Sequence, residues 1–488
     1  MDPKAVIIGS GIAGLASAIR LSKKGFHVTV FEKNAYAGGK LSETRIGNFR
    51  FDTGPSLFTL PDLMEELFIL CGEDFSANLP LLRIDPVCKY FYPDGSIINS
   101  CSDVNTFAKH LEEETGTPCG DLNGYLNSCK ELYDLTAPVF IFRPFADLKT
   151  LFRKESWKVL MNLKKLNIFR TLHDFNSSFF NDKRVVQLFD RYATYNGSDP
   201  YRAPATLSMI SHLEHNLGAY YPEKGMYSII ESLVKLAERN GVKFCFNTKV
   251  TAIEYDKGHV RSIKVNDETV SADIIVSDID MINTYNLLKG IDVPEKYIRD
   301  RSSSAMIYYW CMNRQFPELD MHNIFFSGNY REEFKYLFDL KKIYSDPTIY
   351  IFISSKKVIT DAPEGCENWF VMINAPENAG QDWESIKEST RDLIIKKISG
   401  TLKKDISQNI IKESVTDPLQ IEAGTSSKGG SLYGNSSNDR MAAFYRHPNY
   451  SKKIRGLYFT GGSVHPGGGI PLCLASAKIV DSLIKQNY

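Results

Sequence analysis

The N-terminal stretch Ala5-Val6-Ile7-Ile8-Gly9-Ser10-Gly11-Ile12-Ala13-Gly14 decides the fold. Its four apolar residues predict a buried parallel strand, and its three glycines predict a tight turn into a helix over 12–24. Gly9 allows the turn, Gly11 lets a pyrophosphate approach the backbone, and Gly14 lets the helix lie close to the strand. The stretch therefore predicts the first half of a dinucleotide-binding unit.

A second strand and an acidic residue complete this unit. The run 27–31 predicts the strand, and Glu32 follows it, where a carboxylate accepts hydrogen bonds from ribose hydroxyls. The N-terminus of the preceding helix offers free N–H groups and the positive end of its dipole to a diphosphate. A glycine-rich turn without a ligand is the alternative, and the combination of strand, helix and acid argues against it.

A second glycine pair decides which dinucleotide is expected. Gly38-Gly39-Lys40 follows the second strand, and Phe51-Asp52-Thr53-Gly54-Pro55-Ser56 comes after it. A simple nicotinamide dehydrogenase does not need this second pair. Two-domain flavoproteins need it, because their chain passes the pyrophosphate and the ribityl chain again. We therefore predict FAD as the cofactor.

The C-terminal region repeats the pattern of strand, glycines and helix. Residues 456–460 predict a buried strand, 461–471 a glycine-rich turn, and 472–485 a helix. We expect the N–H groups of Gly469 and Ile470 to hold the negative edge of a reduced flavin. A glycine-rich loop without cofactor contact is the alternative.

Composition limits the remaining possibilities. The 488 residues should form two domains or three. A formal net charge of zero argues against a nucleic-acid partner. Nine scattered cysteines without a C-x-x-C pair, and no signal peptide before the first strand, predict a reduced, cytoplasmic protein. No apolar run approaches the roughly 18 residues that span a bilayer.

The segment 140–180 is both basic and aromatic. Between Arg143 and Arg170 only Asp147 and Glu155 oppose its positive charge. The cations alternate with apolar and aromatic residues over two expected helices, a pattern typical of the headgroup boundary of a membrane. We expect this segment to face membrane lipids, and the alternative is a solvated helix face over a core.

Three aromatic runs predict strands, at 306–311, 349–353 and 369–373, that can form one sheet of a substrate domain. His212 and His215 stand three apart on an expected helix. Two ligands without a cluster of further Cys, Asp or His residues are too few, so we predict no metal site.

The motifs at both ends of the chain resemble those of the bacterial phytoene desaturase family, which are FAD-dependent carotenoid desaturases related in fold to amine oxidases. The C-terminal run His465-Pro466-Gly467-Gly468-Gly469-Ile470-Pro471 is the most specific of them. Within the family, Gly54-Pro55-Ser56-Leu57-Phe58-Thr59 and Gly461-Gly462-Ser463-Val464-His465 are most similar to the 1-hydroxycarotenoid 3,4-desaturase branch.

The resemblance implies an α/β fold, with a Rossmann-type FAD-binding domain (1–86, 222–280 and 425–488) interleaved with a mixed α+β substrate domain (87–221 and 281–424). It implies that Glu32 holds the adenosine ribose, that Lys40 lies near the pyrophosphate and that the Val250 backbone contacts the adenine. The full set of expected cofactor-binding residues is Gly9, Gly11, Gly14, Glu32, Lys33, Gly39, Lys40, Gly54, Pro55, Ser56, Val250, Asp278, Gly462, Gly469, Ile470 and Pro471.

The implied reaction removes a hydride and a proton from adjacent carbons of a carotenoid, and oxidised flavin takes the hydride. His465 is the catalytic candidate, and the alternative is that it only holds its loop. With one dinucleotide fingerprint we expect no NAD(P)H site, and electrons leave to oxygen or a membrane quinone. The enzyme is then peripheral on the inner face of the cell membrane. The rival functions are phytoene or diapophytoene desaturase, carotenoid isomerase, flavin amine oxidase and a redox-silent carotenoid-binding flavoprotein.

Overall fold

A five-stranded parallel sheet has the N-terminal strand at its centre in the computed structural model, which describes residues 2–144, 161–162, 166–167, 169–439 and 442–484. β1 (Lys4–Ile8) lies between β2 (His27–Phe31) and β13 (Ile274–Ser277), and β9 (Lys243–Cys245) and β19 (Leu457–Phe459) form the two edges. The apolar residues of β1 are buried on both faces, as in parallel sheets generally. The sheet joins strands from both ends of the chain.

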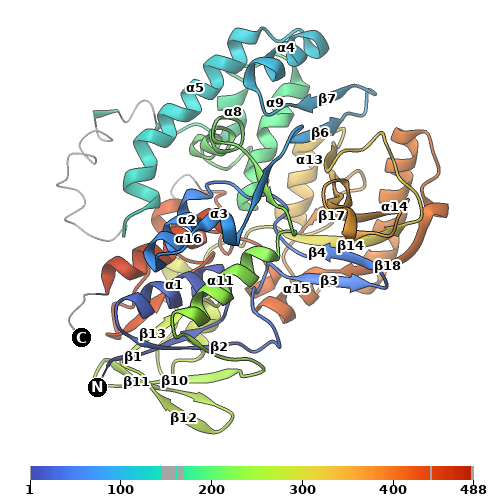
Figure 1. The fold of residues 1–488 in the computed structure, drawn as a ribbon. Coiled ribbons are helices and arrows are strands. Elements are labelled where there is room, and N and C mark those ends of the chain that lie inside the picture. Colours follow the sequence, from blue (N-terminus) through green and yellow to red (C-terminus); the bar gives the residue numbers. More distant parts are fainter. Residues whose placement is uncertain (1, 145–160, 163–165, 168, 440–441, 485–488) are drawn as a thin grey trace.

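Helices cover one face of this sheet and a small antiparallel sheet covers the other (Figure 1). The helices are α1 (Ile12–Lys23), α2 (Asp62–Cys71), α11 (Ser228–Arg239) and α16 (Ile470–Leu483). The small sheet is the meander β10 (Val250–Asp256), β11 (His259–Val265) and β12 (Glu268–Ser271). These three layers form the Rossmann-type domain that the family resemblance implies.

A seven-stranded sheet forms the second part of the molecule. All its strand pairs are antiparallel except β15 with β6. In spatial order the strands are β18 (Ile410–Thr416), β14 (Ser304–Met312), β17 (Glu367–Ala375), β16 (Ile349–Phe352), β15 (His322–Phe325), β6 (Cys88–Phe91) and β7 (Ile97–Ser100). The three aromatic strands expected in one sheet, β14, β16 and β17, are confirmed to lie together in it.

The two faces of this sheet pack against different parts of the molecule. Tyr308 and Trp310 of β14 belong to the core cluster that also contains Ile394 and Ile398 of α14 (Trp383–Leu402). The alternate residues Ile307 and Tyr309 belong to the opposite face, because side chains alternate along a strand. That second face lines the cavity described below.

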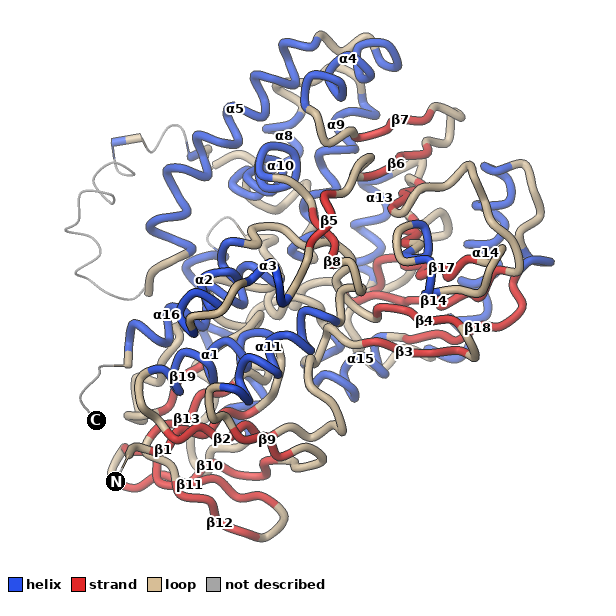
Figure 2. Tube along the Cα trace, in the orientation of Figure 1, coloured by secondary structure: helices blue, strands red, loops and turns tan. Residues whose placement is uncertain are grey.

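A helical region packs on the β6–β7 edge of the sheet and lies at the top of Figures 1 and 2. It contains α4 (Val104–Thr115), α5 (Cys119–Thr136), α8 (Leu172–Asn176), α9 (Lys183–Asp190) and α10 (Met209–His212). The remaining named helices and strands are α3 (Phe75–Asn78), α12 (Met281–Asn286), α13 (Tyr330–Lys335), α15 (Pro418–Thr425), β3 (Glu43–Ile46), β4 (Phe49–Asp52), β5 (Leu81–Arg83) and β8 (Tyr220–Pro222). No helix among the described residues is long and apolar enough to cross a bilayer.

One local prediction needs correction. The C-terminal helix begins at Ile470 rather than 472, because Pro471 fits its first turn.

Most of the basic segment 140–180, including Lys164 and Lys165, lies outside the described residues. The division into the two interleaved domains remains our proposal.

Candidate active site

One cavity of about 1030 Å³ joins the two sheets. It begins where the parallel strands end, at Gly9 after β1, Glu32 after β2 and Asp278 after β13, and it extends to the face of the seven-stranded sheet that carries Tyr309. Ligands of open parallel sheets bind outside the carboxyl ends of the strands. The cavity therefore has the position expected of a cofactor site that is continuous with a substrate site.

The first glycines shape the entrance to α1. Gly11 is the N-cap of α1 and provides no side-chain cap, and its position beside the cavity brings the N-terminus of the helix to the cavity wall. A Cβ on Gly11 would stand 2.6 Å from Asp278 Oδ2, and one on Gly14 would overlap the Gly9 carbonyl oxygen. Gly9 and Gly11 line the cavity, whereas Gly14 lies in the contact between helix and strand.

Glu32 is held in place at the end of β2. One of its carboxylate oxygens accepts hydrogen bonds from the Ser10 N–H at 3.0 Å and the Ser10 hydroxyl at 2.7 Å, and the other accepts from the Asn34 N–H at 2.9 Å. The side chain is buried and lines the cavity. Lys33 beside it also lines the cavity, and its ammonium group donates to the Ala423 carbonyl.

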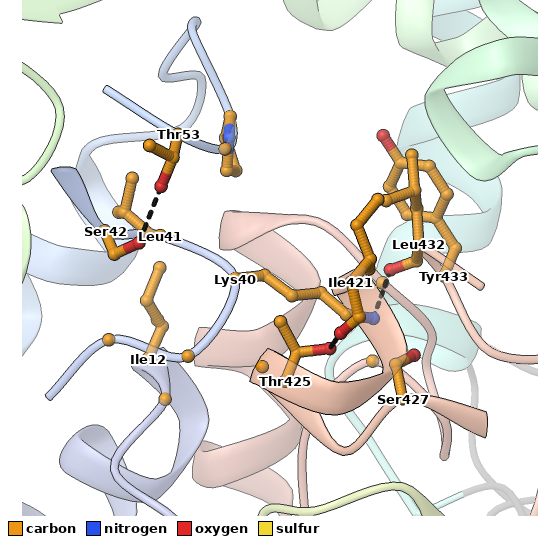
Figure 3. A pocket seen from close by; sticks show the side chains of 18 of the residues that line it. Ile12, Lys40, Leu41, Ser42, Thr53, Ile421, Thr425, Ser427, Leu432 and Tyr433 are labelled. Atoms are coloured by element: carbon orange, nitrogen blue, oxygen red, sulfur yellow. Dashed lines mark hydrogen bonds between the residues drawn. The ribbon is translucent and has the colours of Figure 1, made fainter. Parts of the chain in front are cut away.

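The second glycine pair approaches the first. An added Cβ on Gly39, which has a φ of +60°, would stand 3.8 Å from the Gly11 Cα. The side chain of the adjoining Lys40 extends to the C-terminal part of the chain, where Nζ donates to the Leu432 carbonyl at 2.6 Å (Figure 3). It also donates to the Ser431 carbonyl at 3.0 Å. Burial lowers the pKa of Lys40 to about 8.

The remaining expected cofactor residues also gather at the cavity. Gly54, Pro55, Ser56 and Val250 line it. So does Asp278, whose carboxylate accepts from the Gly14 N–H at 2.9 Å. Burial raises the pKa of Asp278 to about 7, and the nearby charge of Glu32 adds to the rise.

A second uncapped helix points its N-terminus at the same cavity. Gly469 is the N-cap of α16, with a φ of +104° and no side-chain cap. A Cβ there would meet no atom within 4 Å among the described residues. Gly462, Gly469, Ile470 and Pro471 line the cavity. Two helix N-termini whose N-cap residues are glycines, and further glycines that leave room for a ligand, fit a dinucleotide.

His465, the catalytic candidate, is not among the described residues that line the cavity. Its Nε2 donates to the Arg143 carbonyl at 2.9 Å, and its own carbonyl accepts from the Asn449 amide at 2.7 Å. Burial lowers the pKa of His465 to about 4, so the ring is neutral. This geometry favours the alternative, in which His465 holds its loop.

His212 and His215 make separate contacts. His212 Nδ1 pairs with the Asn216 amide at 2.7 Å, and His215 Nε2 pairs with the Tyr192 hydroxyl at 2.9 Å. No group of three metal-ligating side chains is found among the described residues.

Sequence reasoning missed a polar cluster in the apolar part of the cavity. Arg191 donates to Glu214 at 2.8 Å, and the hydroxyls of Tyr192 and Tyr195 donate to the same carboxylate at 2.6 Å. His322 is a further polar residue of the cavity wall. These residues come from short elements far apart in the sequence, and no motif marks them.

Comparison with known proteins identifies the class. The family model for flavin containing amine oxidoreductases matches residues 12–280. The chain belongs to this family. It is therefore an FAD-dependent oxidoreductase, and the glycines and helix N-termini described above fit its cofactor.

The chain is 47% identical over 483 residues to a 1-hydroxycarotenoid 3,4-desaturase from Flavobacterium sp. (strain P99-3), covering 99% of each chain. It is 30% identical to a phytoene desaturase from Fusarium fujikuroi, covering 99% of this chain and 89% of that one. Among solved structures, an oxidoreductase from Methanosarcina mazei has the same fold, with a TM-score of 0.64 and 15% identity, covering 99% of this chain and 100% of that one.

Proposed function

We propose that this chain is an FAD-dependent carotenoid desaturase that introduces a 3,4 double bond into a 1-hydroxylated acyclic carotenoid end group. The near full-length similarity to a 1-hydroxycarotenoid 3,4-desaturase supports the substrate class. The single structural observation that carries the proposal is the continuity of one cavity from the two helix N-termini with glycine N-caps to an apolar, aromatic sheet face.

Each part of the cofactor has a candidate partner. Glu32 would accept from the ribose hydroxyls, and the Val250 backbone would contact the adenine. The N-terminus of α1 and the glycine pair before Lys40 would hold the pyrophosphate. The N–H groups at the start of α16 would stabilise negative charge on the flavin ring. All these residues line the same cavity, which supports the assignment.

The substrate end of the cavity suits a polyene. One face of the seven-stranded sheet lines this end of the cavity. Its lining residues include Ile307 and Tyr309 of β14, Ile324 of β15, and Phe370 and Met372 of β17. A volume of about 1030 Å³ lies just above the range of about 300–1,000 Å³ typical of small-molecule sites, which fits a cofactor and part of a long substrate.

Desaturation breaks one C–H bond at C3 and one at C4. One hydrogen leaves with its electron pair as a hydride, and the other is then lost as a proton, which passes to the solvent. FAD, when bound, supplies the two-electron acceptor for the hydride. The aromatic rings of Tyr309 and Phe370 can stabilise positive charge that develops on the polyene. The buried, apolar wall keeps water from that charge.

We further propose that the enzyme acts at the inner surface of the cell membrane and passes its electrons to oxygen or a membrane quinone. The substrate is a membrane lipid by its chemistry, and the basic, aromatic segment 140–180 is suited to a lipid surface. Two described residues of this segment, Met161 and Phe169, are 82% and 77% exposed.

The proposed function is tested by product analysis. The purified flavoprotein is incubated with acyclic carotenoids of equal length with and without a 1-hydroxyl, and products are separated by chromatography. We expect one added conjugated double bond, seen as a shift to longer wavelength, only in the hydroxylated compound. Conversion of phytoene instead would contradict the substrate assignment while leaving a carotenoid desaturase.

A further inference from the structure

Three polar side chains form a hydrogen-bonded chain on the apolar sheet face of the cavity. The Ser56 and Tyr350 hydroxyls are 2.6 Å apart, and the Tyr350 hydroxyl is 2.7 Å from His322 Nδ1. All three residues line the cavity. Ser56 directly follows Gly54-Pro55 in the expected cofactor stretch, so the chain runs from the cofactor end into the substrate end.

Strand pairing fixes the His322 ring. His322 of β15 stands opposite Phe352 of β16, and Tyr350 lies two residues from Phe352 on the same face. The imidazole stacks on the Phe352 ring at 5.2 Å and on the Tyr350 ring at 6.1 Å between centroids. The residue is only 3% exposed, and burial lowers the pKa of His322 to about 3, so the ring stays neutral.

The second ring nitrogen of His322, Nε2, is buried and lacks a hydrogen-bond partner among the described residues. Buried polar atoms are nearly always paired, because leaving one unpaired is unfavourable. An unpaired nitrogen on the wall of a substrate cavity therefore points to a group that the substrate brings.

An alcohol suits this nitrogen in both of its forms. If Tyr350 donates to Nδ1, then Nε2 carries the proton and donates to the alcohol oxygen. If Nδ1 carries the proton, then Nε2 accepts from the alcohol O–H. A hydrocarbon can pair with neither form. The site therefore distinguishes a hydroxylated end group from its unhydroxylated counterpart.

We propose that His322 is a specificity-determining residue that binds the 1-hydroxyl of the substrate through Nε2. The inference rests on the proposed function, because it names the side chain that recognises the proposed substrate. In a 1-hydroxycarotenoid a single carbon separates the hydroxyl-bearing carbon from C3. A residue that holds the hydroxyl therefore also positions the bond that is oxidised.

The polar cluster around Glu214 is held together mainly by contacts among its own residues. Glu214 accepts from Arg191 and from two tyrosine hydroxyls. Arg191 Nε also lacks a partner among the described residues. Its guanidinium, however, lies over the rings of Tyr90, Tyr192 and Tyr195 at 4.5–5.3 Å, and these π faces take up part of its charge.

The test compares His322→Phe and His322→Gln with the wild-type flavoprotein. Phenylalanine keeps the stacked ring and removes both nitrogens, whereas glutamine keeps a donor and an acceptor. The measured quantity is the ratio of kcat/KM for a 1-hydroxylated carotenoid to kcat/KM for the unhydroxylated carotenoid of equal length. Bound FAD is quantified in every variant.

We expect His322→Phe to lower this ratio by about 10- to 100-fold with FAD still bound, and His322→Gln to retain most of it. An unchanged ratio in FAD-bound His322→Phe overturns the inference and leaves the proposed function standing. A wild-type enzyme that does not prefer the hydroxylated compound overturns both.

If His322→Phe does not fold, a second pair of variants tests the role of His322. Tyr350→Phe removes the hydroxyl that orients the imidazole, and we expect a smaller fall in the same ratio. Tyr308→Phe is the matched control, because this buried hydroxyl belongs to the opposite face of the sheet and donates to the Lys387 carbonyl at 2.6 Å. Equal ratios in the two variants would overturn the inference.

Discussion

Lys40 and Leu432 stand 392 positions apart in the sequence, yet Lys40 Nζ donates a 2.6 Å hydrogen bond to the Leu432 carbonyl (Figure 3). The bond ties the second glycine pair to the segment that precedes the C-terminal strand and α16. The N-terminal and C-terminal contributions to the cavity are thereby joined through one buried ammonium group.

Replacing this lysine should loosen the site. We expect Lys40→Met to lower the free energy of unfolding by about 1–3 kcal/mol, because the Leu432 carbonyl loses its donor, and to weaken FAD binding. Urea denaturation and flavin titration of the apoprotein measure the two effects. Lys335→Met is the control, since Lys335 is an exposed lysine that pairs with Glu332 on the surface of α13. Equal losses in both variants would contradict the role given to Lys40.

Gly11→Val should abolish FAD binding. The φ of Gly11 is −67°, which any residue adopts, so the substitution acts only through the space that its side chain fills beside Asp278. Gly400→Val in α14 is the control, because an added Cβ there meets nothing within 4 Å among the described residues. The flavin absorbance of the purified proteins is the measurement. A folded Gly11→Val protein that keeps its flavin would refute the site.

The stability of the flavin-free protein should depend on Asp278. Burial raises its pKa from the usual 3.8 to about 7, so between these values the folded protein holds a proton that the unfolded chain has lost. This contribution to stability is present below about pH 4 and is lost as the pH rises toward 7. Asp278→Asn cannot ionise but still accepts from the Gly14 N–H. We expect the Tm of the wild type to fall over this range relative to the variant, and parallel profiles would contradict the assignment.

The basic segment should bind anionic lipid. Cations near such a surface contribute roughly 1 kcal/mol each, and salt weakens the attraction. We expect the double variant Lys164→Glu, Lys165→Glu to reduce flotation with anionic liposomes at low salt, whereas Lys335→Glu on α13 should not. Unchanged flotation of the double variant would remove this segment as the docking face.

Local patterns were enough to predict much of the fold. The apolar run before Gly9 and the run 456–460 predict buried strands, and each is followed by glycines and a helix, because the turn needs residues without side chains. The alternation in β14, with Tyr308 and Trp310 on one face and Tyr309 on the other, likewise follows from strand geometry.

Pairing between distant segments could not be predicted in this way. β6 lies beside β15 in parallel, and nothing in either run indicates that partner. His322 belongs to a four-residue strand and carries no motif, so its place on the cavity wall depends on register with β16. His465 stands in the most specific motif of the chain, but its ring nitrogen Nε2 donates to the Arg143 carbonyl instead of facing the cavity.

The most direct test of the account is an anaerobic single turnover. The flavoprotein is mixed with one equivalent of a 1-hydroxylated acyclic carotenoid, while the flavin absorbance and the carotenoid products are followed together. We predict that the flavin bleaches and that one equivalent of 3,4-desaturated product forms at the same rate. A flavin that stays oxidised while the carotenoid isomerises or remains unchanged, or one that bleaches only with amines, would contradict the account.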